Sequence, residues 1–284
     1  MFETLKNVFR VKEMRRKLLY LIWMIFIIRI GCQIPVPGVD SDFFKQWFSS
    51  NAGDAFNFFD AFTGGSFERM SIFALNITPY ITSSIIIQLL TIAIPALEEM
   101  QRDGEEGRKK MTAITRYVTV GLALFESIAM AIGFGRQGMI PNLDFFKGVV
   151  VVACLTAGSA MLMWLGERIT EKGVGNGISI VLTINIISRV PSDLTLLYEN
   201  FIKGKTIAKG TLAGLIIAAV ILLVVVLVLI LNGAERRIPV QYSKKMVGRK
   251  LMGGQSTNIP LKVNTAGVIP VIFASSIMSF PAVI

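Results

Sequence analysis

Few residue combinations in this sequence could catalyse a reaction. The 284 residues include no histidine, which removes the commonest general base and every histidine-containing zinc site. Cys32 and Cys154 lie inside apolar segments, where we expect small buried hydrophobes and no disulfide or redox pair. Serine chemistry would then need a lysine or aspartate partner, and the apolar segments offer neither at mid-depth. The sequence therefore predicts a protein that is not an enzyme and that needs no cofactor or metal.

Polar side chains that could bind a solute gather where one apolar run is interrupted, at Asn76, Thr78 and Ser83 around Pro79. Proline removes a backbone hydrogen bond and clashes with the preceding turn, so two helical pieces joined by a break are expected. Secondary transporters also build their sites from broken helices, which makes a transporter the alternative function. The break carries no charged residue, and this favours a seal over a solute site.

The first of the two pieces is a predicted short helix over residues 66–73, which follows Gly64 and Gly65. It is too short to cross a bilayer and carries Glu68 and Arg69 near its centre. We expect it to dip from the outside into a cavity lined by protein or water. The alternative is a proline-kinked span with an amphipathic helix on the outer surface.

The elements that must position these residues are membrane spans. The chain is 53% hydrophobic and only 17% charged, and residues 211–231 run without a charge. A span needs about 20 apolar residues. Runs of this kind predict an all-α polytopic membrane protein with seven crossings, at 18–34, 75–96, 112–132, 146–165, 177–190, 211–232 and 264–284.

The basic residues are distributed unevenly between the two sides of this bundle. With the N-terminus in the cytoplasm, the inner segments contain 19 lysines and arginines, against at most nine on the outer side. The inner segments are 1–17, 97–111, 166–176 and 233–263. This asymmetry predicts a cytoplasmic N-terminus by the positive-inside rule. The basic N-terminal segment 1–17 is either an interfacial helix or an ordinary basic flank.

The last inner segment carries more basic residues than orientation requires. Its three basic pairs are Arg236 and Arg237, Lys244 and Lys245, and Arg249 and Lys250. Closely spaced cations of this kind bind phosphates or an acidic protein face, so ribosomal RNA or an acidic partner is one interpretation. A topogenic loop that contacts lipid headgroups is the other.

Four collinear stretches of the sequence resemble the SecY family of bacterial protein-export channels. They are residues 71–75 with 79–90, residues 163–180, residues 255–257, and residues 261–277. The resemblance implies a pore-forming subunit that exports unfolded polypeptides and inserts membrane proteins. It also implies ten helices in two inverted halves of five. On that basis, residues 18–190 form the first half, residues 191–284 begin the second, and the match is truncated within the seventh helix.

The resemblance assigns an apolar ring that closes the pore to Ile77, Ile81, Ile178, Leu182 and Ile272. The spacing agrees in part, because the first two and the next two are each four residues apart and so share a helix face. Without the resemblance, isoleucines at this spacing would be expected to face lipid or a neighbouring helix.

The resemblance assigns three further sets of residues. The plug, at about 59–74, includes Phe62, Gly64, Gly65, Phe67 and Arg69, with the two glycines as its hinge. A gate that opens sideways into lipid includes Thr82, Gln88, Glu126 and Phe280, although Glu126 could instead be a neutral, hydrogen-bonded side chain of the bundle. The three basic pairs, Arg236, Arg237, Lys244, Lys245, Arg249 and Lys250, would dock a ribosome or motor.

The partners that the resemblance implies are the SecE and SecG subunits, the SecA motor, the ribosome, a translocating polypeptide or signal sequence, and the lipid bilayer. The expected location is the bacterial inner membrane. The push on the polypeptide would come from its synthesis or from the motor's ATP cycle.

Overall fold

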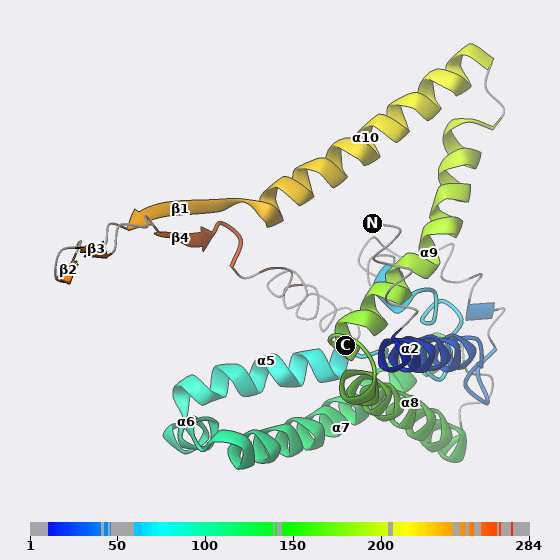
Figure 1. Cartoon of the computed structure of the whole chain (residues 1–284). Helices are drawn as coiled ribbons and strands as arrows, with labels where there is room; N and C mark the ends of the chain where they lie inside the picture. Colours follow the sequence, from blue (N-terminus) through cyan, green and yellow to red (C-terminus); the bar gives the residue numbers. More distant parts are fainter. Residues whose placement is uncertain are drawn as a thin grey trace. The chain divides into compact units, whose positions relative to one another are not determined.

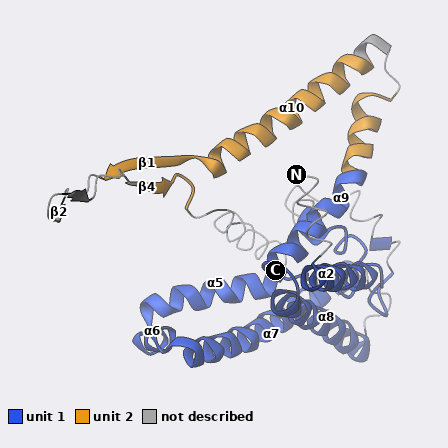
Figure 2. Ribbon diagram, in the orientation of Figure 1, with its two compact units in different colours: residues 1–192, 273–284 blue, residues 193–272 orange. Residues whose placement is uncertain are grey.

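The protein divides into two compact units, formed by residues 1–192 with 273–284 and by residues 193–272 (Figure 2). The structure is a computed structural model. It describes residues 11–40, 43, 44, 46, 60–138, 140, 144–203, 207–240, 245–247, 250–252, 257–265, 267 and 274.

The first unit is helical (Figure 1). Its helices are α2 (Lys12–Gly31), α5 (Thr78–Ala93), α6 (Pro95–Arg102), α7 (Gly104–Arg136), α8 (Phe145–Lys172) and most of α9 (Gly177–Phe201). Helix α7 packs against α5 and α8, and α2 packs against α8. The chain turns by 104° between α5 and α6, where Pro95 occupies the first turn of α6 and cannot continue the hydrogen bonds of α5.

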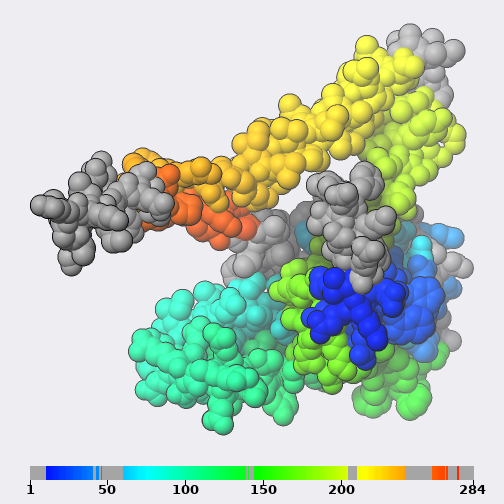
Figure 3. Space-filling model, in the orientation of Figure 1, coloured from blue at the N-terminus to red at the C-terminus, as the bar shows by residue number. Residues whose placement is uncertain are grey.

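The second unit contains the end of α9, helix α10 (Ile207–Gly233) and two small antiparallel sheets. Strand β1 (Glu235–Val240) pairs with β4 (Thr257–Lys262), and β2 (Lys245–Val247) pairs with β3 (Lys250–Met252). The apolar side chains of α10 from Leu212 to Leu231 are exposed on the surface of this unit (yellow in Figure 3). An isolated apolar helix of this length is stable only when lipid or another helix surrounds it.

Four helices of the described chain are long and apolar enough to cross a membrane: α7, α8, α9 and α10. The bent pair α5–α6 would be a fifth if it counts as one span. Helix α2 is not among them, because Arg15, Arg16, Lys17 and Arg29 lie on it. The predicted seventh span, 264–284, lies almost entirely outside the described residues.

Helices continue into three of the charged segments that separate the predicted spans. The inner segment 97–111 is folded as α6 and the first turns of α7, and most of segment 166–176 is the end of α8. Helix α9 likewise continues beyond residue 190 to Phe201. A charged residue ends an apolar run but not a helix, since arginine, lysine and glutamate are good helix formers.

The predicted short helix over residues 66–73 is wrong. The backbone there forms successive four-residue turns, with amide-to-carbonyl hydrogen bonds from Met70 to Phe67, from Ala74 to Ser71 and from Asn76 to Phe73. Met70 and Asn76 have positive φ angles of 44° and 52°, which interrupt a helix at both places. The break before α5 was predicted correctly, since α5 begins at Thr78 with Pro79 in its first turn.

Two hydrophobic clusters form the interior of the first unit. One joins the turns before α5 to α7 and α8, and the three rings of Phe44, Phe67 and Phe134 pack edge to face inside it, with centroids 5.1 to 6.1 Å apart. The second joins α2, the same turns, α8 and α9. Both clusters therefore hold the turn segment, residues 60–77, from two sides.

Candidate functional site

The second cluster contains four of the five residues assigned to the apolar ring. Ile77 is fully buried within it, and Ile81, Ile178 and Leu182 are half-buried against it. The fifth, Ile272, lies outside the described residues. Branched alkyl side chains from the start of α5 and the start of α9 thus meet in one patch, which excludes water without offering a hydrogen bond.

A glycine allows this close approach. A Cβ atom on Gly166 of α8 would lie 3.3 Å from Cγ1 of Ile178 and 3.4 Å from Cδ1 of Ile77. Contacts at these distances are tight, so a side chain there would press on two of the assigned ring residues at once. Gly166 lies within a stretch that the sequence analysis used for family resemblance, but its packing against the ring was not predicted.

A carboxylate organises the start of the turn segment. Asp60 is fully buried, and its Oδ1 accepts hydrogen bonds from the Glu68 amide at 2.9 Å and the Thr63 hydroxyl at 3.2 Å. Between these residues, Gly64 and Gly65 adopt φ angles of 68° and 80°, which other residues rarely adopt. Glycine is therefore needed at both positions because the backbone forms a tight loop there, which Asp60 closes.

The residues assigned to the plug all lie in this turn segment. Phe67 is buried in the aromatic trio of the first cluster, while Arg69 is exposed and donates a hydrogen bond to the side chain of Gln33. The Phe62 carbonyl accepts a hydrogen bond of 2.9 Å from the Asn76 side chain. A backbone bridge between Pro35 and Ser71 completes the contact with the chain that follows α2.

Helix α9 meets the turn segment through polar side chains that the sequence analysis did not single out. Arg189 forms an ion pair with Asp60, and Asn185 donates a hydrogen bond of 3.0 Å to Asn76. Arg29 of α2 donates to the same Asn185 at 3.2 Å. The available signal was the spacing, because Asn185 and Arg189 continue the apolar face of α9 that carries Ile178 and Leu182.

Comparison with known proteins decides the family. The SecY family profile matches residues 71–284. A protein translocase subunit SecY from Halalkalibacterium halodurans is 44% identical to this chain over 99% of its length. The chain belongs to the SecY family. It spans about two thirds of that relative's length, 66%.

Solved structures of SecY-family channels share the fold. One is a SecY protein whose plug domain stabilises the closed state of the translocation channel, with a TM-score of 0.60 and 20% identity. Another is Sec61 in a canine ribosome-channel complex, with a TM-score of 0.59 and 20% identity. Each comparison covers 95% of this chain, and 57% and 58% of the other chains.

The residues that the SecY resemblance assigns to the gate are dispersed over α5 and α7. Thr82 is half-buried and its hydroxyl has no hydrogen-bond partner within the part of the chain that the structure describes. Gln88 is exposed, Glu126 is half-buried, and Phe280 lies outside the described residues. Glu126 has no hydrogen-bond partner among the residues described, so the alternative of a neutral, hydrogen-bonded glutamate gains no support there.

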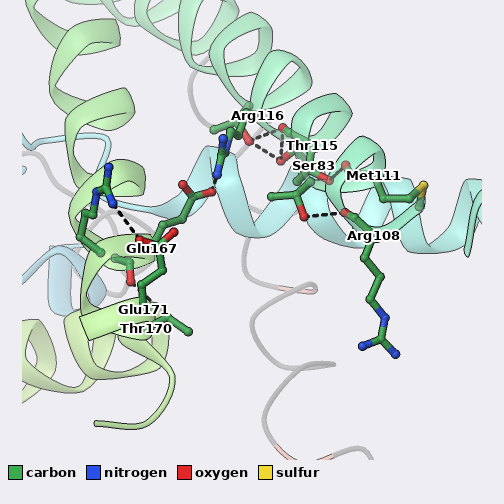
Figure 4. A network of polar contacts seen from close by, with 12 residues as sticks. Ser83, Arg108, Met111, Thr115, Arg116, Glu167, Thr170 and Glu171 are labelled. Carbon is green, nitrogen blue, oxygen red and sulfur yellow. Dashed lines mark hydrogen bonds and ion pairs between the residues drawn. The ribbon is translucent and has the colours of Figure 1, made fainter. Parts of the chain in front are cut away.

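Polar contacts tie α5, α7 and α8 together. The Ser83 and Thr119 hydroxyls are 2.6 Å apart, and Arg116 Nε donates to Glu167 at 2.9 Å (Figure 4). A cavity of about 500 Å³ opens beside that ion pair, with Ile178 in its wall. These contacts hold α5, α7 and α8 together.

Of the six basic residues assigned to docking, the structure describes four. Arg236 and Arg237 are exposed on β1, opposite Leu261 and Pro260 of β4. The backbones of Lys245 and Lys250 lie in the β2–β3 pair, while Lys244 and Arg249 fall outside the described residues. The described residues of the basic loop therefore form two antiparallel strand pairs, which together we call the β-hairpin arm.

The described residues hold no group of three or more histidine, cysteine, aspartate or glutamate side chains that could bind a metal ion. Cys32 is buried and Cys154 half-buried, and neither forms a disulfide.

Proposed function

We propose that this chain is the pore-forming part of a protein-conducting channel, which exports unfolded polypeptides and inserts membrane proteins. The observation that carries the proposal is the meeting of Ile77, Ile81, Ile178 and Leu182 in one apolar cluster of a SecY-family chain. The secondary transporter is not retained, because two of the three polar side chains at the helix break, Asn76 and Ser83, form hydrogen bonds within the protein.

The proposed ring works by packing. Branched alkyl side chains close the pore when no substrate is present, because they contact one another and exclude water and ions. A polypeptide in transit replaces those contacts with contacts of its own. The ring offers it no fixed donor or acceptor, so the chain slides and its sequence is not read. Catalysis has no part in this scheme, and we propose that the chain is not an enzyme.

The proposed plug, at about 59–74, occupies most of the turn segment. It ends shortly before Ile77, so its position and the position of the ring are linked through the backbone. Moving the plug aside would clear one side of the ring. The gate proposed at Thr82, Gln88, Glu126 and Phe280 would then let apolar segments of the substrate pass sideways into lipid.

The proposed partners follow from the family and from the charge of the β-hairpin arm. We propose that the arm docks the ribosome or the SecA motor on the cytoplasmic face, and that SecE and SecG complete the channel. The bacterial inner membrane is the proposed location, with the N-terminus inside. The apolar, exposed surface of α10 supports a lipid or helical environment.

Cysteine crosslinking tests the pore assignment. A polypeptide stalled during export should crosslink to cysteines placed at Ile81 and Ile178 in the translocase as the cell assembles it. Ile187 on α9 provides a matched control, because its side chain is 58% exposed and it lies nine residues beyond Ile178, on the opposite face of the helix. Crosslinks at Ile187 that equal those at Ile81 and Ile178 would refute the proposed pore.

A further inference from the structure

One face of α9 carries two different kinds of side chain. Ile178, Leu182, Asn185 and Arg189 are separated by four, three and four residues, so they line one face of the helix. The first two belong to the apolar cluster proposed as the ring. The other two are polar and follow them along the same face.

The polar half of this face contacts the turn segment at three points. Arg189 pairs with Asp60, and Asn185 bonds to Asn76. Between them, Gly64 lies so close to α9 that a Cβ atom would be 2.6 Å from the Asn185 carbonyl oxygen and 2.9 Å from the Ser188 hydroxyl. Both ends of the turn segment and the loop at Gly64 therefore lie against α9.

The side chains that join α9 to the turn segment are buried, so breaking their contacts is costly. Asp60 is fully buried and the Arg189 side chain is 19% exposed, so little water can replace either partner if they separate. Asn76 and Asn185 are each 1% exposed. A buried charge that loses its partner is far more costly than an exposed one. The exposed bond between Arg69 and Gln33 holds the same segment much less firmly.

We propose that Asp60, Asn76, Asn185 and Arg189 form a polar latch that keeps the plug against α9 while the channel is at rest. The proposal rests on the proposed pore function. None of the four residues touches the polypeptide in this scheme. They are positioning residues, which set how readily the plug leaves.

The latch also connects the plug to the ring. Asn76 directly precedes Ile77, and Asn185 lies one helical turn beyond Leu182 on α9. Moving α9 away to widen the ring would separate Arg189 from Asp60 and Asn185 from Asn76. Ring opening and plug release are thus expected to occur together, since the rigid helix α9 takes part in both.

Resting ion conductance tests the latch. The complete translocase would be reconstituted in lipid vesicles, and its conductance measured without substrate and with a trapped polypeptide. Asp60→Asn keeps the acceptor for the Glu68 amide and removes the charge that faces Arg189. We expect it to raise the resting conductance about tenfold. Glu98→Gln is the matched control, because it breaks an exposed ion pair with Arg102 on α6 and should change nothing.

A double-mutant cycle separates the latch from a general loosening of the fold. Asp60→Asn and Arg189→Gln together should leak no more than the leakier single variant, because both remove the same interaction. If the increases in conductance of the two single variants multiply in the double variant, Asp60 and Arg189 do not act as a pair. If Asp60→Asn does not accumulate in the membrane, Asn76→Gly replaces it as the test variant, since glycine keeps the backbone angle and removes both side-chain hydrogen bonds of Asn76.

The failures of the latch and of the pore differ. Suppose that the wild-type channel conducts only with a trapped polypeptide and that the latch variants leave the resting conductance unchanged. This result would overturn the latch and leave the pore function standing. A wild-type protein that conducts nothing even with a trapped polypeptide would overturn the pore function and the latch with it.

Discussion

Asn76 and Asn185 are hydrogen bonded through their side-chain amides, Nδ2 of Asn185 to Oδ1 of Asn76 at 3.0 Å, although 109 residues separate them. Nδ2 of Asn76 donates to the Phe62 carbonyl, and Oδ1 of Asn185 accepts from Arg29. The two amides therefore join α2, the turn segment and α9. Buried polar networks of this kind fix one arrangement of the elements, because a shifted arrangement would leave buried groups unpaired.

The first prediction concerns the backbone of Asn76, whose φ angle is 52°. Asn76→Gly should lower the free energy of unfolding by about 1 kcal/mol, for the lost amide bonds. Asn76→Ala should lower it by about 1 kcal/mol more, because an ordinary side chain is strained at this angle. Thermal unfolding of the purified protein in detergent measures both. Equal stability of the two variants would contradict the left-handed backbone.

The second prediction concerns two glycines of α8. A Cβ atom on Gly158 would overlap the Ile72 carbonyl oxygen, whereas Gly148 has nothing within 4 Å of that position. Gly158→Ala should therefore destabilise the protein by about 2 kcal/mol. Gly148→Ala should be neutral or slightly stabilising, since alanine favours helix. Urea titration followed by circular dichroism compares them, and a harmless Gly158→Ala would mean that α8 lies farther from the turn segment.

The third prediction concerns Phe67, which packs against Phe44 and Phe134 with centroids 5.9 and 6.1 Å away. Phe67→Ala should cost about 3 kcal/mol of stability, because it leaves a cavity between the turns and α7. Phe145→Ala is the control, since Phe145 is 87% exposed at the start of α8. If differential scanning calorimetry finds equal losses, the turn segment is not anchored by this aromatic trio.

The sequence predicted the helical membrane fold because long apolar runs report it directly. The run at 211–231 became α10, and the proline at position 79 marked the start of α5 correctly. The turn segment could not be predicted in this way. Its backbone bonds to residues 34–36, which follow α2, so its conformation depends on tertiary contact and not on local propensity.

The candidate apolar ring was predicted from the SecY resemblance, and the spacing of its residues supports that prediction only in part. Ile77 with Ile81, and Ile178 with Leu182, lie four apart, and the structure brings all four into or against one cluster. Asp60 and Arg189 are far apart in the sequence and different in type, so nothing local joins them. Their pairing depends on the fold that places α9 beside the turns.

The last prediction concerns the basic arm, and it rests on the proposed docking role. Arg249→Glu together with Lys250→Glu should weaken ribosome or motor binding about tenfold at low salt, because two attractive contacts become repulsive. For the ribosome, the slope of log affinity against log salt should also become shallower by about two, one for each lost phosphate contact. Fluorescence titration of the translocase with ribosomes, over a series of salt concentrations, gives both quantities.

Lys203→Glu provides the control for this experiment. It reverses an exposed basic residue after α9 that pairs with Glu199 at 2.9 Å and that the positive-inside analysis places on the opposite side of the membrane. A docking surface confined to the arm predicts no change in affinity or salt slope for this variant. An equal loss of affinity from Lys203→Glu would reveal a nonspecific effect of net charge. An unchanged affinity after charge reversal at Arg249 and Lys250 would show that these two residues of the arm do not belong to the docking surface.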